Sequence, residues 1–325
     1  MKDNFVPPGS LTTPVLFIIF NRPDTTQKVF NAIRQAKPKQ LFVAADGPRP
    51  DKEGEKEKCE QVRKIIEQVD WDCEVNTLFR DKNLGCKIAV SPAIDWFFEN
   101  IEEGIILEDD CLPDQSFFQF CEKMLVRYRN DIRIMMISGT NYLFNKVTIS
   151  ESYFFSKYYA IWGWATWRRA WIKYDVNMNS WPEFRNKKQL TRIFSDKEII
   201  EYYTNMFQAA YNNRINTWDI QWVYSCIFNN GLSIVPGKNL IANIGVTGTH
   251  TGPKPSIFIN MPTVAISTNN IKHPAFVIPN VLCDKAIYYN ILTNGNKLKS
   301  NIIKFLKQIK IYNYIRILYR KLKNI

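Results

Sequence analysis

Short apolar runs and segments of helical spacing alternate along the first 140 residues. Between the runs, apolar residues recur every three or four positions, as Val62, Ile65 and Val69 do. Strands that alternate with helices predict an α/β fold, with a Rossmann-like, mostly parallel sheet flanked by helices. The predicted strands are residues 14–20, 41–45, 73–79 and 105–107.

Polar side chains follow the first three predicted strands. Arg22 comes after the first, Asp46 after the second, and Arg80 and Lys87 after the third. The carboxyl ends of parallel strands share one sheet edge, where open α/β sheets bind ligands. Arg22 there suits a phosphate or base, Asp46 a base or ribose, and the other two suit phosphate. A lone loop arginine is usually solvated, so the shared edge supports this interpretation.

The fourth run ends in three consecutive carboxylates, Glu108, Asp109 and Asp110, before Pro113 and Asp114 open a helical pattern. Hard oxygen ligands in this place suit Mg²⁺ or Mn²⁺ that holds a substrate diphosphate. The alternative is a solvated acidic turn, because acidic residues favour the first turn of a helix.

Composition and missing motifs narrow the class of protein. The chain lacks G-x-G-x-x-G and G-x-x-x-x-G-K-[ST], so nothing favours an NAD enzyme or a P-loop NTPase. A net charge of +12 indicates an anionic partner. The seven cysteines are scattered without a C-x-x-C pair, which predicts reduced, buried thiols in a cytosolic protein. Neither a signal peptide nor an apolar run of about 20 residues occurs.

Aromatic residues crowd residues 158–171, after a further strand predicted at 132–137. One interpretation is an aromatic core wedge with a helix that starts near Thr166. The other is a sugar platform, where Gly163 allows close approach and a tryptophan stacks on a pyranose. We expect both, with 162–164 at the site and Trp167 and Trp171 in the core.

Residues 174–216 are polar and largely helical, which suits an insertion that shapes an acceptor side. Thr217 to Trp222 then head an apolar helix. Asp219 is either a first-turn carboxylate stabilised by the helix dipole or a general base that takes a proton from an acceptor hydroxyl.

The ordered set of these segments resembles a GT-A glycosyltransferase over roughly residues 14–250. It is most similar to the inverting N-acetylglucosaminyltransferases of N-glycan processing and to family 2-type bacterial enzymes of surface-polysaccharide synthesis. The segments that carry the resemblance are Val15–Arg22, Val43–Asp46, Asn83–Gly85, Ile106–Asp110, Pro113–Asp114 and Phe117–Phe118.

The resemblance implies a role for each polar residue of the strand ends. Asp110 would bind Mn²⁺ (or Mg²⁺) and bridge it to the donor diphosphate. Asp109 would contact ribose or the water shell of the metal, and Glu108 the donor sugar. Arg22 and Asp46 would hold the uridine end.

The same resemblance extends to the second half of the chain. A Gly-Trp loop, here Gly163 and Trp164, would lie beneath the donor sugar. Asp219, in its Trp-Asp context at a helix start, would be the base. His250 is either a structural residue or a late metal ligand, and we assign nothing to His273.

The tail from Lys285 holds ten basic residues and no acidic one, with apolar residues at helical spacing between them. Residues 296–325 therefore predict a basic amphipathic helix on an anionic membrane surface. A terminal helix docked on the domain is the alternative. No recognisable nucleic-acid module accompanies the charge, so we expect no nucleic-acid partner.

We therefore predict a domain over 1–295, with a donor half at 14–140 and an acceptor half at 141–295, and a membrane-surface tail over 296–325. Its reaction would be metal-dependent, inverting transfer from a UDP-sugar to a glycan or lipid-linked glycan acceptor at the inner face of the bacterial cytoplasmic membrane. The product would be lipopolysaccharide, capsule or a lipid-linked oligosaccharide. Alternatives are an inactive carbohydrate- or membrane-binding protein on this fold, and a nucleotidyltransferase, which the missing Gly-rich N-terminal loop disfavours.

Overall fold

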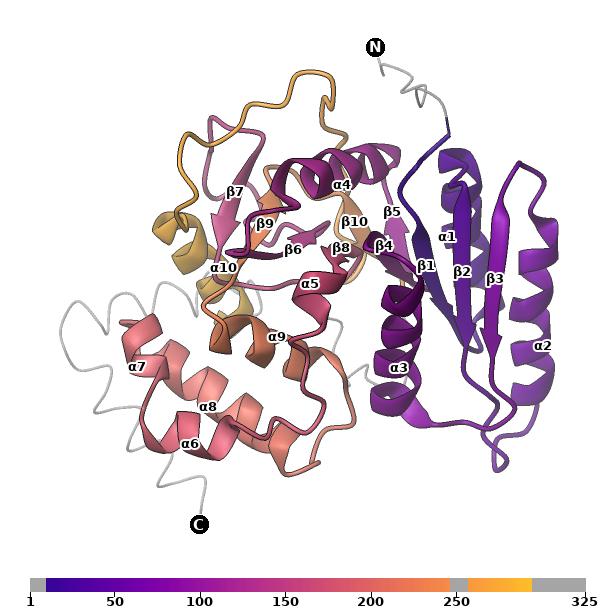
Figure 1. The fold of residues 1–325 in the computed structure, drawn as a ribbon, viewed down its shortest axis with the longest axis horizontal. Helices are drawn as coiled ribbons and strands as arrows, with labels where there is room; N and C mark the ends of the chain where they lie inside the picture. The colour runs from indigo at the N-terminus through magenta and orange to yellow at the C-terminus, as the bar shows by residue number, and fades with distance from the viewer. Residues whose placement is uncertain (1–9, 246–256, 294–325) are drawn as a thin grey trace.

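The computed structural model describes residues 10–245 and 257–293 (Figure 1). Within these residues a large sheet has the strand order β3-β2-β1-β4-β8-β6-β9-β7, and β5 and β10 form a second, small sheet. The strands are β1 Val15–Ile19, β2 Gln40–Ala45, β3 Glu74–Phe79, β4 Glu103–Glu108, β5 Cys111–Pro113, β6 Ile134–Ser138, β7 Tyr153–Ser156, β8 Trp164–Trp167, β9 Leu232–Pro236 and β10 Ile241–Asn243. The helices are α1 Pro23–Ala36, α2 Glu55–Ile65, α3 Gly85–Asn100, α4 Gln115–Tyr128, α5 Arg168–Trp171, α6 Trp181–Asn186, α7 Leu190–Ile193, α8 Lys197–Tyr211, α9 Asp219–Phe228 and α10 Val281–Thr293.

The first four strands of the large sheet run parallel, as the alternating pattern predicts. Val15 of β1 lies opposite Leu41 of β2 and Ile105 of β4, and β3 adds to the other side of β2. β8 then pairs antiparallel with β4, and β6 follows it. The α/β fold class with a large central sheet flanked by helices is thus confirmed. A strand from beyond residue 141 joins the sheet directly beside β4.

Both faces of the sheet are covered by helices. Val15 and Phe17 pack with α1, α2 and α4 on one face, whereas Leu16 and Ile106 pack with α3, α5 and α9 on the other. Burial on both faces is what makes these strands continuous apolar runs instead of alternating ones. A third cluster joins α6–α10.

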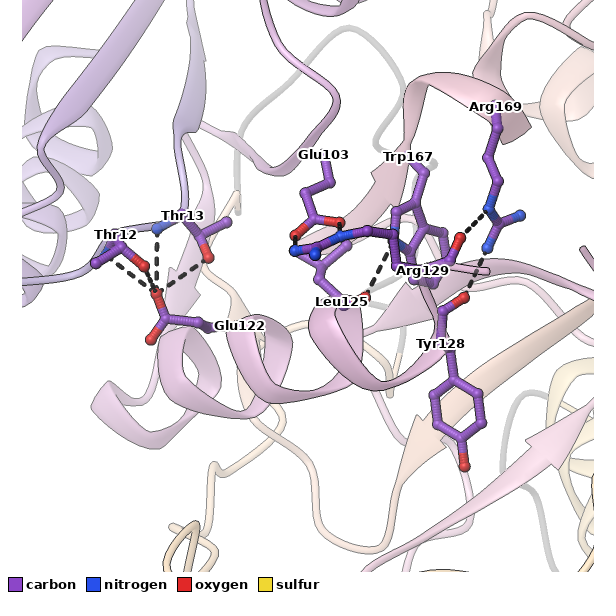
Figure 2. A network of polar contacts seen from close by, with 9 residues as sticks. All are labelled: Thr12, Thr13, Glu103, Glu122, Leu125, Tyr128, Arg129, Trp167 and Arg169. Carbon is purple, nitrogen blue, oxygen red and sulfur yellow. Dashed lines mark hydrogen bonds and ion pairs between the residues drawn. The ribbon is translucent and has the colours of Figure 1, made fainter. Parts of the chain in front are cut away.

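Polar contacts fix α4 against the sheet (Figure 2). In the middle of α4, Glu122 accepts hydrogen bonds from the backbone of Thr12 and Thr13, at 3.0 and 3.1 Å. At its end, Arg129 donates to Glu103 of β4 at 2.8 Å, and the Trp167 indole donates to the Leu125 carbonyl at 3.2 Å. Arg169 donates to the carbonyls of Arg129 and Tyr128. These contacts hold β1, β4 and β8 in fixed relation to one helix.

The aromatic segment differs in part from the prediction. Trp167 and Trp171 lie in the core, 1% and 3% exposed, as predicted. The helix predicted near Thr166 is wrong at its start, because Trp164 to Trp167 form strand β8 and α5 begins at Arg168. Pairing of Ala165 with Ile105 satisfies the backbone of this segment in the sheet.

All seven cysteines are free, and five of them are buried as predicted, whereas Cys73 and Cys86 are partly exposed. No helix in the described part of the chain is long and apolar enough to span a bilayer. The tail predicted over 296–325 lies outside the described residues.

The many charged residues of 51–58 predict a solvated loop, and for Glu55 this prediction is wrong. Glu55 begins α2 and is only 4% exposed. It accepts hydrogen bonds from Asn21 Nδ2 at 2.8 Å and from Arg49 N at 2.7 Å, so it ties together the loops after β1 and β2. Burial opposes its ionisation, yet the hydrogen bonds from Arg49 and Asn21 outweigh burial and lower its pKa to about 2.

Replacement of Glu55 by Gln should lower the free energy of unfolding by roughly 1.5–3 kcal/mol at pH 7, because charge-assisted hydrogen bonds are lost. Because the folded pKa is depressed, this advantage of the wild type is present above the ordinary value of 4.5 and is lost as pH falls toward about 2. Urea unfolding at a series of pH values measures it. Glu57→Gln, an exposed change on the same helix, is the control, and a wild-type advantage that stays constant down to pH 3 contradicts the assignment.

Candidate functional site

Arg22 joins the ends of two neighbouring parallel strands. Ile18 of β1 lies opposite Glu108 of β4, so the residues that follow both strands meet at one edge. Arg22 Nη1 donates to Asp110 Oδ2 at 2.8 Å, and Nη2 donates to Asp109 Oδ1. Asp109 also accepts from the Phe20 backbone at 3.3 Å. The guanidinium is therefore held in one orientation by both carboxylates.

The edge carries more carboxylates than positive groups. Burial raises the pKa of Glu108, and the charges of Asp110, Asp109 and Asp219 raise it further, while Arg22 lowers it. Burial likewise raises the pKa of Asp109, against the attraction of Arg22. No described residue donates a hydrogen bond to the Glu108 carboxylate. Such an excess of negative charge favours a bound cation.

Gly245 approaches this cluster closely. A Cβ at this position would lie 2.4 Å from Asp110 Oδ2 and 3.0 Å from Arg22 Nη1, so a larger residue here would push the Asp110 carboxylate away from its present position. The approach follows from the pairing of β10 with β5 and from the hydrogen bond between Ile244 N and the Asp110 carbonyl, at 2.8 Å. Gly245 was not among the predicted site residues, although it is the first of three closely spaced glycines, at 245, 248 and 252, around His250. His250 lies outside the described residues.

The carboxylates fit an open site for a Mg²⁺-like ion better than a site in which protein ligands alone surround the metal. In the described ranges, no group of three or more His, Cys, Asp and Glu side chains is placed to hold a metal. Asp110 Oδ1 accepts only a thiol hydrogen bond from Cys111, at 3.5 Å, and Glu108 has no described partner. Mg²⁺ is typically bound by one or two carboxylates together with water and substrate phosphates. Glu108 and Asp110 match that pattern.

Asp46 lies at the same edge, but protein donors use both of its oxygens. Oδ1 accepts from Leu84 N at 3.0 Å and from Gly47 N at 2.9 Å, and Oδ2 accepts from Asn83 Nδ2 at 2.9 Å. Asp46 thus holds the turn that leads into α3. Arg80 donates to the Ala89 carbonyl at 3.0 Å, and burial lowers its pKa.

The first turn of α3 also carries the segment before α9. Lys87 donates from Nζ to Asn213 at 3.0 Å, and its backbone N–H donates to Asn216 Oδ1 at 3.1 Å. Gly85, at φ +77°, lies directly against the Asn216 amide. These contacts bring the start of α9, where Asp219 is the first residue, to the edge where β3 and β4 end.

Asp219 belongs to the same electrostatic site as the acidic triplet. Thr217 Oγ1 donates to its Oδ1, and its charge contributes to the raised pKa of Glu108. Burial and the charges of Glu108 and Asp219 also raise the pKa of the Cys86 thiol, to about 12. Residues about 110 positions apart in the chain are thereby brought together.

The sequence predicts that a tryptophan of residues 162–164 stacks on a pyranose, but in this structure the Trp164 ring has no exposed face to do so. Trp164 is 0% exposed and stacks on Trp218, with ring centroids 5.7 Å apart and planes inclined by 21°. Its ring fastens β8 to α9 instead. Gly163, at φ +59°, allows Ile241 to approach, since a Cβ would lie 2.4 Å from Ile241 Cδ1. The partly exposed neighbour, Trp162, meets the Tyr142 ring edge to face at 6.0 Å.

Comparison with known proteins adds little to this geometry. No protein-family model matches the chain, and no curated protein matches it. Among solved structures, the chain is similar to a cytidylyltransferase from Leptospira borgpetersenii serovar Hardjo-bovis, at a TM-score of 0.28 and 12% identity. The match covers 51% of this chain and 64% of that one, which is less than two thirds of its length. A likeness of this size carries no argument about function.

Replacement of Arg22 by Met leaves Asp109 and Asp110 without their counter-charge. We expect a loss of about 3 kcal/mol in the free energy of unfolding, because one partner of a largely buried ion pair is removed. Addition of Mn²⁺ should then raise the melting temperature of Arg22→Met more than that of the wild type, since the cation replaces the guanidinium. Differential scanning fluorimetry measures both effects.

The control is Arg34→Met, which removes a solvent-exposed ion pair with Asp70 and should leave the free energy of unfolding nearly unchanged. An equal response of all three proteins to Mn²⁺ would mean that the acidic edge does not bind the ion.

Proposed function

We propose that this chain is a metal-dependent glycosyltransferase of the GT-A type, which transfers a sugar from a UDP-sugar to an acceptor hydroxyl. One observation carries the proposal: Arg22, the triplet of residues 108–110 and Asp219 converge at the carboxyl edge of the parallel strands. This edge is where open α/β sheets bind their ligands.

Asp110 and Glu108 would hold Mn²⁺ or Mg²⁺, because their oxygens have the fewest protein partners. When bound, the ion supplies charge stabilisation to the departing diphosphate, so that no acid is needed there. Arg22 keeps a fixed positive charge beside these carboxylates, within reach of an anionic donor. Asp109, which is 2% exposed, orients Arg22.

Asp219 would take the proton from the acceptor hydroxyl. It is the first residue of α9, and one of its oxygens is held by Thr217. It also lines a cavity of about 140 Å³, which gives an acceptor access to the carboxylate. Direct displacement with a single base on the acceptor side inverts the configuration at the anomeric carbon.

UDP release from a panel of UDP- and GDP-sugars, with Mn²⁺ or with EDTA, tests the proposal without knowledge of the acceptor. We expect Mn²⁺-dependent UDP release that falls about 100-fold or more in Asp110→Ala, because a metal ligand is lost. Asp219→Asn should keep UDP binding and lose about 100-fold or more in sugar transfer. The exposed Asp72→Asn is the control and should behave as the wild type.

Undiminished release in Asp110→Ala contradicts the assignment of the site. Binding of UDP without turnover would favour an inactive binding protein, and formation of a nucleotide-sugar from UTP and a sugar phosphate would favour a nucleotidyltransferase.

We also propose that the protein works on the anionic inner face of a cytoplasmic membrane. Large apolar side chains are exposed at the start of α10 and just before it: Phe276 by 73%, Ile278 by 64%, Val281 by 58% and Leu282 by 72%. The chain from Lys285 onward is basic and free of acidic residues. Apolar surface next to a basic sequence suits insertion among anionic lipids.

Flotation with vesicles that contain phosphatidylglycerol tests the membrane proposal. The double variant Phe276→Ser, Leu282→Ser should reduce the vesicle-bound fraction about tenfold, because the burial of two large apolar side chains is lost. The matched control is Ile132→Ser, Ile172→Ser, which removes side chains exposed by 72% and 80% elsewhere on the surface. Equal binding of the two double variants would contradict insertion at residues 276–282.

A further inference from the structure

Tyrosines gather around the cavity that Asp219 lines. Within the described residues, the cavity of about 140 Å³ lies among α8, α9, α10, β9 and the segments that follow β6 and β7. Tyr142, Tyr158, Tyr202 and Tyr203 contribute to its wall, and apolar side chains such as Met206 complete it.

The hydroxyls of these four tyrosines make no hydrogen bond with the described residues. Tyr158 is 6% exposed, and its buried hydroxyl has no hydrogen-bond partner. None of the described residues bonds the hydroxyls of Tyr142, Tyr202 or Tyr203 either. By contrast, the Tyr159 hydroxyl donates to the Gly231 carbonyl at 2.6 Å. An unpaired buried hydroxyl is costly in a folded protein, so such a group points to a ligand that pairs with it.

The charged side chains that line the cavity determine which ligand charge it can accept. Asp219 is its one charged side chain, and no Lys, Arg or His lies among its described residues. Burial is the main cause that raises the pKa of Tyr142 and of Tyr202, and the negative charge of Asp219 raises both further. A carboxylate or phosphate on the ligand would be repelled there with no cation to compensate it.

The size of the cavity suits one six-membered ring. A cavity of about 150 Å³ with a purely apolar lining holds benzene. The buried, unpaired Tyr158 hydroxyl favours a ring that carries hydroxyls of its own, while the tyrosine faces can cover its C–H surface.

We propose that the cavity binds an uncharged pyranose and that it selects neutral acceptor sugars over uronic acids and phosphorylated sugars. The Tyr158 hydroxyl pairs with a ring hydroxyl, and Asp219 lies beside the bound ring. The part played by Asp219 as the base rests on the proposed function, whereas pyranose binding by the cavity does not.

Saturation-transfer NMR and calorimetry with the methyl glycosides of glucose, galactose and mannose test the proposal without donor or metal. At least one glycoside should bind with a millimolar Kd, and the matching methyl uronide should bind at least tenfold more weakly. Tyr158→Phe should weaken glycoside binding about tenfold while its melting temperature stays equal to or above that of the wild type, because an unpaired hydroxyl is removed. A merely structural tyrosine would show the opposite pattern.

Tyr159→Phe is the matched control: Tyr159 also lines the cavity, but its hydroxyl is held by the Gly231 carbonyl, so loss of this hydroxyl should leave glycoside affinity unchanged. Tyr202→Phe provides a second test of the cavity should Tyr158→Phe fold poorly, with the same expected loss of affinity. No binding of any neutral glycoside at 100 mM, or equal binding of uronides, overturns the proposal. Because these assays contain no donor, their failure is distinct from a failure of donor turnover.

Discussion

The bridge from Arg22 to Asp109 and Asp110 is the interaction on which the rest of the site depends. It forms because β1 and β4 are parallel neighbours, so that the residues after both strands emerge side by side. Removal of a buried carboxylate from water is costly without a partner, and Arg22 supplies that partner for Asp109. Gly245 lies so close to the bridge that a side chain at this position would displace the Asp110 carboxylate. The result is a rigid, negatively charged edge at which Arg22 does not pair with Glu108.

A second constraint places Asp219 at that edge. Trp164 and Trp218 stack in the core, and this contact attaches α9 to β8, the strand beside β4. The α3 contacts of Asn213 and Asn216 fix the approach to α9 from the other side. The tyrosine-lined cavity then opens at the same carboxylate, so an acidic edge and a hydroxyl-rich cavity share Asp219.

The parts that the sequence predicted well are those with a local signal. The parallel strands β1, β2 and β4 are apolar on both faces, and the acidic triplet begins at the end of β4, so both features stand out in a single stretch of residues. Pairing of Ala165 with Ile105 depends on a partner 60 residues away, and therefore β8 was taken for the start of a helix. The residue type at position 164 does not distinguish a tryptophan that faces a ligand from one that faces the core. Glu55 was assigned to solvent because charged residues usually are, and only the tertiary contacts with Asn21 and Arg49 show its burial.

The central claim is that the edge formed by Arg22 and residues 108–110 holds a metal-bound nucleotide diphosphate. Anomalous scattering from crystals grown with UDP and Mn²⁺ tests it most directly, because the ion is located by its own signal. We expect one manganese peak in contact with an Asp110 carboxylate oxygen, with the diphosphate between this ion and Arg22. A diphosphate bound elsewhere, with the bridge between Arg22 and Asp110 intact and no manganese beside it, would contradict it.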